Sequence, residues 1–288
     1  MSKFKYPLVL SIAGSDSGGG AGIQADLKTI SALGCFGTTA ITAVTIQNTL
    51  GVSGIHPIPV DFVKAQIKAV MEDLRPSAIK IGMVHSAELV IGIAEALNSY
   101  QNVPVIFDPV MVATSGDRLV KSGAVETLKQ QLFPLAELIT PNLEEAAILA
   151  QMDIGNIEDM KNAAIQIMKS GCNAILIKGG HLKGIDLFDV YLDKKGNERI
   201  FSSKVIDTVN THGTGCSLSS AIASFLALGN NMEVSISKAK IYVYQAIANG
   251  KDVKTGEGHG PLNHFFDPQK LVKQTYTPKL LPLQNEIS

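Results

Sequence analysis

The chain has 288 residues, of which 45% are hydrophobic and 18% are charged, so it carries enough apolar material for a sizeable core. Its 25 basic and 26 acidic side chains leave a net charge of −1, which argues against nucleic acid or a membrane surface as the main partner. The three cysteines form no disulfide or zinc pattern, and the first apolar run is too short for a secretory signal, so we expect a cytoplasmic protein.

Strands and helices are predicted to alternate along the chain. Short apolar or β-branched runs predict strands at residues 8–13, 38–46, 78–81, 103–107, 138–139, 174–177, 187–192 and 199–205. Apolar residues at helical spacing predict helices at residues 23–33, 87–97, 123–132, 143–150 and 160–168, and helices that begin near residues 60, 216 and 233. This order predicts an α/β fold with a mainly parallel central sheet and helices on both faces.

No internal repeat, low-complexity block or linker interrupts this pattern. We therefore expect one domain over residues 1–276 and a loosely attached tail over residues 277–288. The region between Asp207 and Glu233 has no charged residue, but glycines and asparagines interrupt it, so we expect a buried helix there and no membrane span.

A glycine-rich loop at residues 14–22 follows the first predicted strand. Gly20, Gly22 and Ala25 match the G-x-G-x-x-A pattern of dinucleotide-binding loops, but residues 43–51 lack the carboxylate that would bind a ribose. The chain also lacks a Walker phosphate loop. The loop could be a flexible surface turn, although Asp26 follows it closely enough to hold a polar ligand.

A second glycine motif, Asn-Thr-His-Gly-Thr-Gly-Cys at residues 210–216, precedes an apolar helix face. The glycines lie where the helix begins, so free backbone N–H groups and the helix dipole favour an anion there, most often phosphate. The same field lowers the pKa of a thiol, which makes Cys216 a candidate base or nucleophile. An ordinary helix start with a small buried cysteine is an equally open interpretation from these residues alone.

Three motifs taken together resemble a known family. They are Ala-Gly-Ser-Asp-Ser-Gly-Gly-Gly-Ala-Gly-Ile-Gln-Ala-Asp at residues 13–26, Thr-Ile-Gln-Asn-Thr at residues 45–49 and His-Gly-Thr-Gly-Cys at residues 212–216. In this order they resemble the hydroxymethylpyrimidine/phosphomethylpyrimidine kinases of thiamine biosynthesis, which belong to the ribokinase-like superfamily. The resemblance extends from about residue 8 to about residue 263.

The resemblance implies a ribokinase-like fold with a small lid or edge β element, which residues 38–58 would form. It implies that ATP and Mg²⁺ are used, that the protein is a homodimer, and that no nucleic acid or membrane is bound. The substrate would be a small aminopyrimidine, 4-amino-5-hydroxymethyl-2-methylpyrimidine. Its hydroxymethyl group would be phosphorylated first, and the monophosphate would then be converted to the pyrophosphate.

The resemblance also assigns roles to individual residues. The anion hole would be Gly213, Thr214, Gly215 and Cys216, with Cys216 accepting the proton of the substrate hydroxyl. The substrate would contact Asp26, Gln47, Met83 and Val110, and the amide of Gln47 could pair with an amino group and the adjacent ring nitrogen. The nucleotide phosphates would contact Asn142, Lys178 and Thr208. Asp108 and Glu145 would organise Mg²⁺ through water.

Other functions stay open at this point. A pyridoxal or pyridoxine kinase is closely related, because some members of this cysteine-bearing branch accept vitamin B6, although Gln47 favours the pyrimidine. A cysteine hydrolase would pair His212 with Cys216 and form a covalent thioester. A non-catalytic binding protein is the remaining alternative, and neither His85 nor His212 receives an assigned role.

Overall fold

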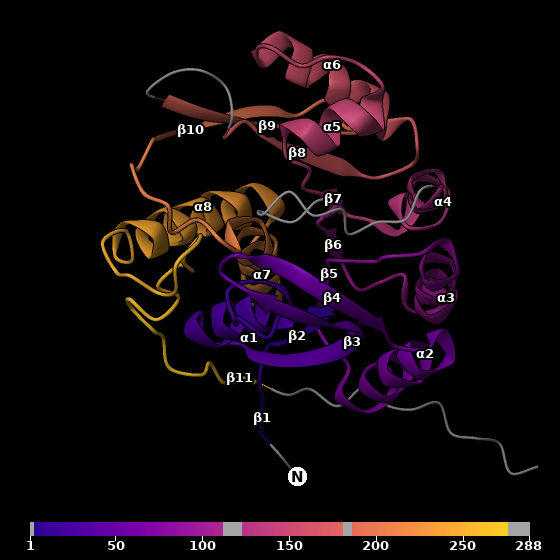
Figure 1. The fold of residues 1–288 in the computed structure, drawn as a ribbon. Helices are drawn as coiled ribbons and strands as arrows, with labels where there is room; N and C mark the ends of the chain where they lie inside the picture. The colour runs from indigo at the N-terminus through magenta and orange to yellow at the C-terminus, as the bar shows by residue number, and fades with distance from the viewer. Residues whose placement is uncertain (1–2, 112–122, 181–185, 276–288) are drawn as a thin grey trace, which may run out of the picture.

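The computed structural model describes residues 3–111, 123–180 and 186–275. Within these residues one large sheet runs through the molecule (Figure 1). Its strands, in their order across the sheet, are β10 (Glu198–Lys204), β9 (Asp186–Asp193), β8 (Ala174–Lys178), β7 (Leu138–Ile139), β6 (Val105–Phe107), β5 (Ala78–Ile81), β2 (Leu8–Ser15), β3 (Phe36–Asn48) and β4 (Gly51–Pro57). The strands from β8 to β3 are parallel, and β9, β10 and β4 pair antiparallel at the two edges.

Helices cover both faces of this sheet, and each face has its own apolar core (Figure 1). One face is covered by α2 (Val60–Ala69), α3 (Ala87–Leu97), α4 (Ala124–Gln131), α5 (Leu143–Ala150) and α6 (Ile157–Met168). The other face is covered by α1 (Gly22–Ala32), α7 (Thr214–Ala227) and α8 (Met232–Ala248). Shorter elements are a π-helical turn (Val70–Leu74), two 3₁₀ turns (Asn98–Tyr100 and Phe133–Leu135), and the small sheet of β1 (Phe4–Lys5) and β11 (Gln274–Thr275).

The central parallel strands β5, β6 and β7 are apolar because both of their faces are covered. Ile79, Ile81 and Ile106 are fully buried, and the helices contribute stripes of alanine, leucine and isoleucine against them. One residue breaks this pattern, since Lys80 lies in the middle of β5 and is also fully buried. A charge in that position needs a partner, and its partner lies beside the candidate site.

The predicted α/β fold is confirmed, and most predicted elements agree with the structure within a few residues. Strand β4 was expected only as part of the segment 38–58. It forms because the side chain of Asn48 accepts a hydrogen bond from the Leu50 amide at 2.9 Å and turns the chain back along β3. Helix α6 begins before the predicted residue 160, because Asn156 caps it by accepting a hydrogen bond from the Asp159 amide.

The predicted tail at residues 277–288 lies outside the described residues. Where the structure describes the chain, none of its helices combines the length and the apolar character needed to cross a membrane.

Candidate active site

A cavity of about 950 Å³ lies at the carboxyl ends of the parallel strands. Its wall includes Asp16 from the loop after β2, Met83 from the segment after β5, Asp108 from the segment after β6 and Lys178 from the end of β8. The first turn of α7 forms another part of the wall. This is the edge at which an open parallel sheet binds its ligands.

The helix start predicted at residues 213–216 is present at the N-terminus of α7. Gly213 is its N-cap with φ of +87°, and a β-carbon there would lie 1.8 Å from the carbonyl oxygen of Gly20, so only glycine fits. Within the described residues the amides of Gly215 and Cys216 have no hydrogen-bond acceptor, and both residues line the cavity. These N–H groups and the positive end of the helix dipole can bind an anion.

The thiol of Cys216 differs from the prediction. Burial raises the pKa of this thiol to about 11, and the nearby carboxylates of Asp26 and Asp108 add to the effect. The ammonium group of Lys80 and the backbone amide of Gly22 lower the pKa but do not compensate. The prediction that the helix terminus brings the pKa of this thiol towards neutrality is therefore wrong, and Cys216 is a protonated thiol at neutral pH.

Beneath this turn lies an ion pair that is closed to solvent. Lys80 Nζ is 2.9 and 2.8 Å from the two carboxylate oxygens of Asp26. The hydroxyls of Ser11 and Ser220 donate to the same carboxylate at 2.5 and 2.7 Å. Asp26 is fully buried and is not part of the cavity wall, so its predicted contact with the substrate is wrong. Its oxygens are occupied by Lys80 and the two serines, which explains why a ligand cannot use them.

A second ion pair lies in the cavity wall. Asp108 Oδ1 accepts hydrogen bonds from Lys178 Nζ at 3.0 Å and from the Thr140 hydroxyl at 3.3 Å. A β-carbon at Gly215 would come within 3.2 Å of Lys178 Nζ and 3.3 Å of Asp108 Oδ2, so the pair lies directly against the anion-binding turn. Burial alone would lower the pKa of Lys178, but Asp108 and Glu145 raise it above its ordinary value, so the lysine keeps its charge.

Asn142 and Glu145 line the cavity as predicted, and they also cap helix α5. Asn142 Oδ1 accepts from the Glu145 amide at 2.9 Å, and the Glu145 carboxylate accepts from the amides of Asn142 and Met111 at 2.9 and 3.3 Å. Burial, together with the charge of Asp108, raises the pKa of Glu145 to about 7, although Lys178 and the two amides act against this.

These residues fit a hydrated magnesium ion. Asp108 and Glu145 offer carboxylate oxygens, the ligand type that Mg²⁺ prefers, and both face the cavity that holds the anion-binding turn. In the part of the chain that the structure describes, no three or more His, Cys, Asp or Glu residues gather as metal ligands. Mg²⁺ usually keeps several of its waters. Two carboxylates are therefore enough to hold it, whereas an ion bound by protein ligands alone would need more of them.

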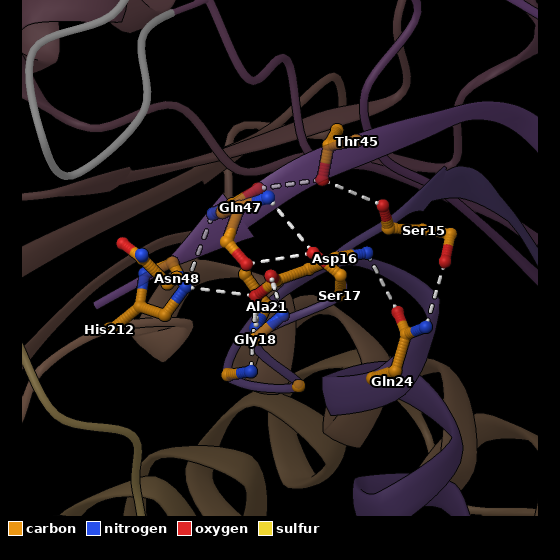
Figure 2. A network of polar contacts seen from close by, with 12 residues as sticks. Ser15, Asp16, Ser17, Gly18, Ala21, Gln24, Thr45, Gln47, Asn48 and His212 are labelled. Carbon is orange, nitrogen blue, oxygen red and sulfur yellow. Dashed lines mark hydrogen bonds and ion pairs between the residues drawn. The ribbon is translucent and has the colours of Figure 1, made fainter. Parts of the chain in front are cut away.

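The first glycine loop binds a carboxylate of the protein itself. Asp16 Oδ1 accepts from the Gly18 amide at 2.8 Å, and Oδ2 accepts from the amides of Gly20 and Ala21 at 3.0 and 2.8 Å (Figure 2). Gln24 fixes the base of the loop, since its side chain accepts from the Asp16 amide at 2.8 Å. The loop amides that could have held a phosphate are therefore occupied, and the loop is a closed, ordered wall of the cavity.

The predicted substrate residues Gln47, Met83 and Val110 all line the cavity. Gln47 lies near the C-terminal end of β3, where the hydroxyl of Thr45 is 3.1 Å from Gln47 Oε1. Its amide nitrogen lies 3.4 Å from Nε2 of His212, which is itself 3.0 Å from Asp16 Oδ2 (Figure 2).

The side of the cavity formed by α8, β9 and β10 carries residues that the sequence did not reveal. Apolar side chains there include Leu187, Val205, Val243 and Ile247. Lys240 forms an ion pair with Asp189 in the same wall. Thr208 does not line this wall, and its hydroxyl donates to the Lys251 carbonyl and accepts from the Asn210 amide. Its contact with a nucleotide phosphate stays a prediction.

Asp16, Lys80 and His212 are further residues that sequence reasoning missed or left without a role. Lys80 had a signal, since a lone lysine inside an apolar strand of four residues needs a buried partner. Asp16 lay inside the motif at residues 13–26, yet nothing in the spacing showed that its carboxylate would fold back onto the loop.

Known proteins have sequences and folds similar to those of this chain. The family model of phosphomethylpyrimidine kinase matches residues 16–263. A hydroxymethylpyrimidine/phosphomethylpyrimidine kinase of Rhizobium meliloti is 48% identical over 259 residues, which cover 90% of this chain and 97% of that protein. A thiamine biosynthesis bifunctional protein of Geobacter sulfurreducens is 47% identical over 258 residues, and the match covers 90% of this chain but only 52% of that longer protein.

The fold is similar to that of a solved pyridoxal kinase. The structure of an ADP complex of Bacillus subtilis pyridoxal kinase superposes with a TM-score of 0.82 and 35% sequence identity. The superposition covers 90% of this chain and 98% of the other.

Proposed function

This chain belongs to the phosphomethylpyrimidine kinase family, and we propose that it transfers a phosphoryl group from ATP to the hydroxymethyl oxygen of 4-amino-5-hydroxymethyl-2-methylpyrimidine. We propose that it then phosphorylates the resulting monophosphate, which gives the pyrophosphate. The observation that carries the proposal is the anion-binding turn at residues 213–216, which shares one cavity with the amide of Gln47.

Different walls of the cavity bind different parts of the two substrates. Gln47, Met83 and Val110 hold the pyrimidine, and the unpaired amides of the α7 turn hold the phosphate that is transferred. The apolar wall of α8, β9 and β10 takes the base of the nucleotide, while Asn142 and Lys178 lie between it and the turn and contact the phosphates. Phosphoryl transfer requires mainly positioning and charge stabilisation, and this arrangement supplies both.

Asp108 and Glu145 would hold Mg²⁺ through water, as their shared position in the cavity supports. When bound, Mg²⁺ neutralises charge on the phosphates of ATP. Lys178 keeps its charge beside Asp108 and can turn towards a phosphate oxygen when the nucleotide arrives.

Cys216 lies where the reacting hydroxyl must approach the turn, so we keep it as the candidate proton acceptor. Because its pKa is raised to about 11, it must lose its own proton before it can accept another. A loose transition state demands little help from a base, so a Cys216→Ala variant should retain measurable turnover. A Cys216→Asp variant should also retain some turnover, whereas a hydrolase that used a thioester would lose all activity in both.

Pyridoxal phosphorylation is the second candidate, because a pyridoxal kinase shares the fold at 35% identity. The identity to the pyrimidine kinase of Rhizobium meliloti is higher, at 48%, and Gln47 offers a donor and an acceptor that match an aminopyrimidine edge. Both observations favour the pyrimidine.

The deciding experiment measures ATP consumption with Mg²⁺ and one acceptor at a time: the aminopyrimidine, its monophosphate or pyridoxal. We expect turnover with the first two and much less with pyridoxal. Turnover with pyridoxal alone would replace the proposed substrate, and no turnover with any of the three would contradict a kinase of this class. A Gln47→Leu variant should weaken pyrimidine binding by about 1–3 kcal/mol, because polar groups of the ligand lose their partners.

We further propose that the protein is a homodimer of the cytoplasm. Ile46 on β3 and Leu50 in the turn to β4 are 69% and 68% exposed, and burial of such side chains between two copies would stabilise a dimer. The three cysteines are unpaired, which suits a reducing compartment. Sedimentation of the wild type and of an Ile46→Lys variant tests the dimer, since the variant should be monomeric.

A further inference from the structure

His212 connects the two glycine loops with the predicted substrate residue Gln47. Its Nε2 lies 3.0 Å from Asp16 Oδ2 and 3.4 Å from the amide nitrogen of Gln47 (Figure 2). Its ring packs against Gly20, where a β-carbon would lie 2.3 Å from the ring carbon Cδ2. Its backbone amide donates to the Gly260 carbonyl at 3.1 Å. The imidazole is therefore held firmly in place beside the cavity.

Asp16 determines which ring nitrogen of His212 carries a proton. Burial would raise the pKa of Asp16, but hydrogen bonds from His212, Ala21 and Gly18 outweigh it and hold the pKa below its ordinary value. An ionised carboxylate can only accept hydrogen bonds. Nε2 of His212 therefore carries a hydrogen and donates it to Asp16.

This assignment decides the orientation of the Gln47 amide. A ring nitrogen that donates to Asp16 cannot also accept from an amide nitrogen. The single hydrogen of the Thr45 hydroxyl meets a similar conflict, because the carbonyl of Ser15 at 2.9 Å and Gln47 Oε1 at 3.1 Å are both acceptors. A half-turn of the amide resolves both conflicts: its carbonyl oxygen then faces His212, and its NH₂ group donates to Thr45, which donates to Ser15 alone.

We propose that the Asp16–His212 pair is the specificity-determining element of the acceptor site, because it holds the Gln47 amide with its carbonyl oxygen towards His212. This inference rests on the proposed function. His212 acts through Gln47 and is thus a positioning residue.

The substrate has the complementary edge. In 4-amino-5-hydroxymethyl-2-methylpyrimidine the amino group neighbours the hydroxymethyl group, which must reach the turn that directly follows His212. The amino group then lies on the His212 side of Gln47, where it needs an acceptor, and the ring nitrogen beyond it meets the NH₂ group. Pyridoxal carries a formyl group beside its hydroxymethyl group, in place of this amino group, and a formyl oxygen only accepts hydrogen bonds, so the carbonyl of Gln47 repels it.

The test compares the aminopyrimidine with 5-hydroxymethyl-2-methylpyrimidine, which lacks the amino group. We measure kcat/KM for both in the wild type, in His212→Leu, in Gln47→Leu and in the double variant. Loss of the amino group should lower the wild-type kcat/KM by about 10- to 100-fold, which is the loss expected when a polar group of the site is left unpaired. In His212→Leu, loss of the amino group should lower kcat/KM by less than about threefold. The kcat/KM of the double variant for the aminopyrimidine should be no lower than that of Gln47→Leu, because the two residues act as one unit.

Several outcomes separate positioning from a merely structural role. The KM for ATP should be unchanged in His212→Leu, whereas a distorted cavity would raise it. Gly20→Ala, which displaces the ring without removing it, should reproduce the loss of discrimination. His212→Gln, which keeps a donor that reaches Asp16, should restore part of it. The exposed His259 provides a matched control, and His259→Leu should behave as the wild type.

Discrimination that stays at the wild-type level in both His212→Leu and Gly20→Ala would overturn this inference while leaving the proposed function intact. So would losses that add in the double variant. A wild-type enzyme that phosphorylates pyridoxal but not the aminopyrimidine would instead contradict the proposed function itself.

Discussion

Two lysine–carboxylate pairs flank the start of α7, and they differ in how many hydrogen bonds the carboxylate accepts from the protein. In the Lys80–Asp26 pair both side chains are fully buried, and the carboxylate receives both Lys80 hydrogen bonds and two serine hydroxyls. In the Lys178–Asp108 pair the lysine is 17% exposed, and a single oxygen of the carboxylate takes its hydrogen bonds. The same residue types thus form a closed pair beneath the turn and an open pair in the cavity wall.

The difference separates support from ligand binding. The closed pair joins α1, which carries Asp26, to β5, which carries Lys80, and the serines add β2 and α7. Two buried charges cost desolvation free energy, so such a pair is retained only where its hydrogen bonds are complete. The open pair has bonding capacity left for a ligand. We therefore expect stability to depend on the first pair and activity on the second.

The largest effect is expected from Lys80→Met. The substitution leaves the buried carboxylate of Asp26 without its counter-ion, and breaking a buried pair in this way costs about 3–5 kcal/mol of unfolding free energy. Chemical denaturation followed by circular dichroism measures the loss. The double variant Lys80→Met/Asp26→Leu should recover much of it, because the uncompensated charge is gone. Equal losses in the single and the double variant would show that packing alone is responsible.

Lys178→Met should have the reverse profile. Loss of a preorganised charge that faces the transferred phosphate lowers kcat by about 10²–10³, or roughly 2.7–4 kcal/mol. The unfolding free energy should change less than in Lys80→Met, since Lys178 is partly exposed. The surface lysine of the Lys64–Glu95 pair is the matched control, and Lys64→Met should keep wild-type kcat. A stability loss as large as that of Lys80→Met would erase the distinction between the two pairs.

Asp108→Asn tests whether the open pair also organises the metal. We expect the Mg²⁺ concentration for half-maximal activity to rise about 10- to 100-fold, the range seen when an outer-sphere partner of a metal is removed. The measurement is a Mg²⁺ titration at saturating ATP and acceptor, with Lys64→Met again as control. An unchanged Mg²⁺ requirement would remove Asp108 from the metal site and leave it as a partner of Lys178 only.

The sequence predicted the strands and helices and most of the cavity residues, but not the partners of the closed pair. The apolar spacing predicted β5, β7, α3 and α5 with the same bounds as in the structure. The pattern of a buried strand or helix face lies within one continuous segment of the sequence, so it can be recognised without knowing the fold. The resemblance placed Gln47, Asp108, Lys178 and the α7 turn, and all of them line the cavity. These residues lie at the ends of strands, directly after strands or at the start of a helix, so their positions depend on the element order that the pattern already contains.

Predictions that depended on distant partners failed. Asp26 follows the glycine loop and was expected to face a ligand, but Lys80, 54 residues later, holds its carboxylate. For Cys216 the effect of the helix terminus on the pKa could be predicted from position, whereas burial and two carboxylates from other elements could not. Such long-range electrostatics require the folded chain.

The ionisation of Cys216 tests the smallest of these effects, because charged groups of both pairs change the pKa of this thiol. Lys80 lowers its pKa, and Asp26 and Asp108 raise it, while burial is the largest contribution and sets the pKa at about 11. The thiol is therefore neutral below this value, and the thiolate fraction should rise about tenfold for each pH unit between 7 and 10. At pH 7 the thiolate fraction should be about 100-fold smaller than for a cysteine of ordinary pKa near 9, since two pH units separate the two pKa values.

The rate of alkylation by iodoacetamide follows this thiolate fraction, and the Cys216→Ser variant gives the contribution of the two other cysteines, which is subtracted. In Asp108→Asn the rate at pH 8 should rise, because a negative charge near the sulfur is gone. A plateau that begins near pH 7 would instead mean that the helix terminus and Lys80 outweigh burial, and the closed pair would then activate the thiol as well as support the fold.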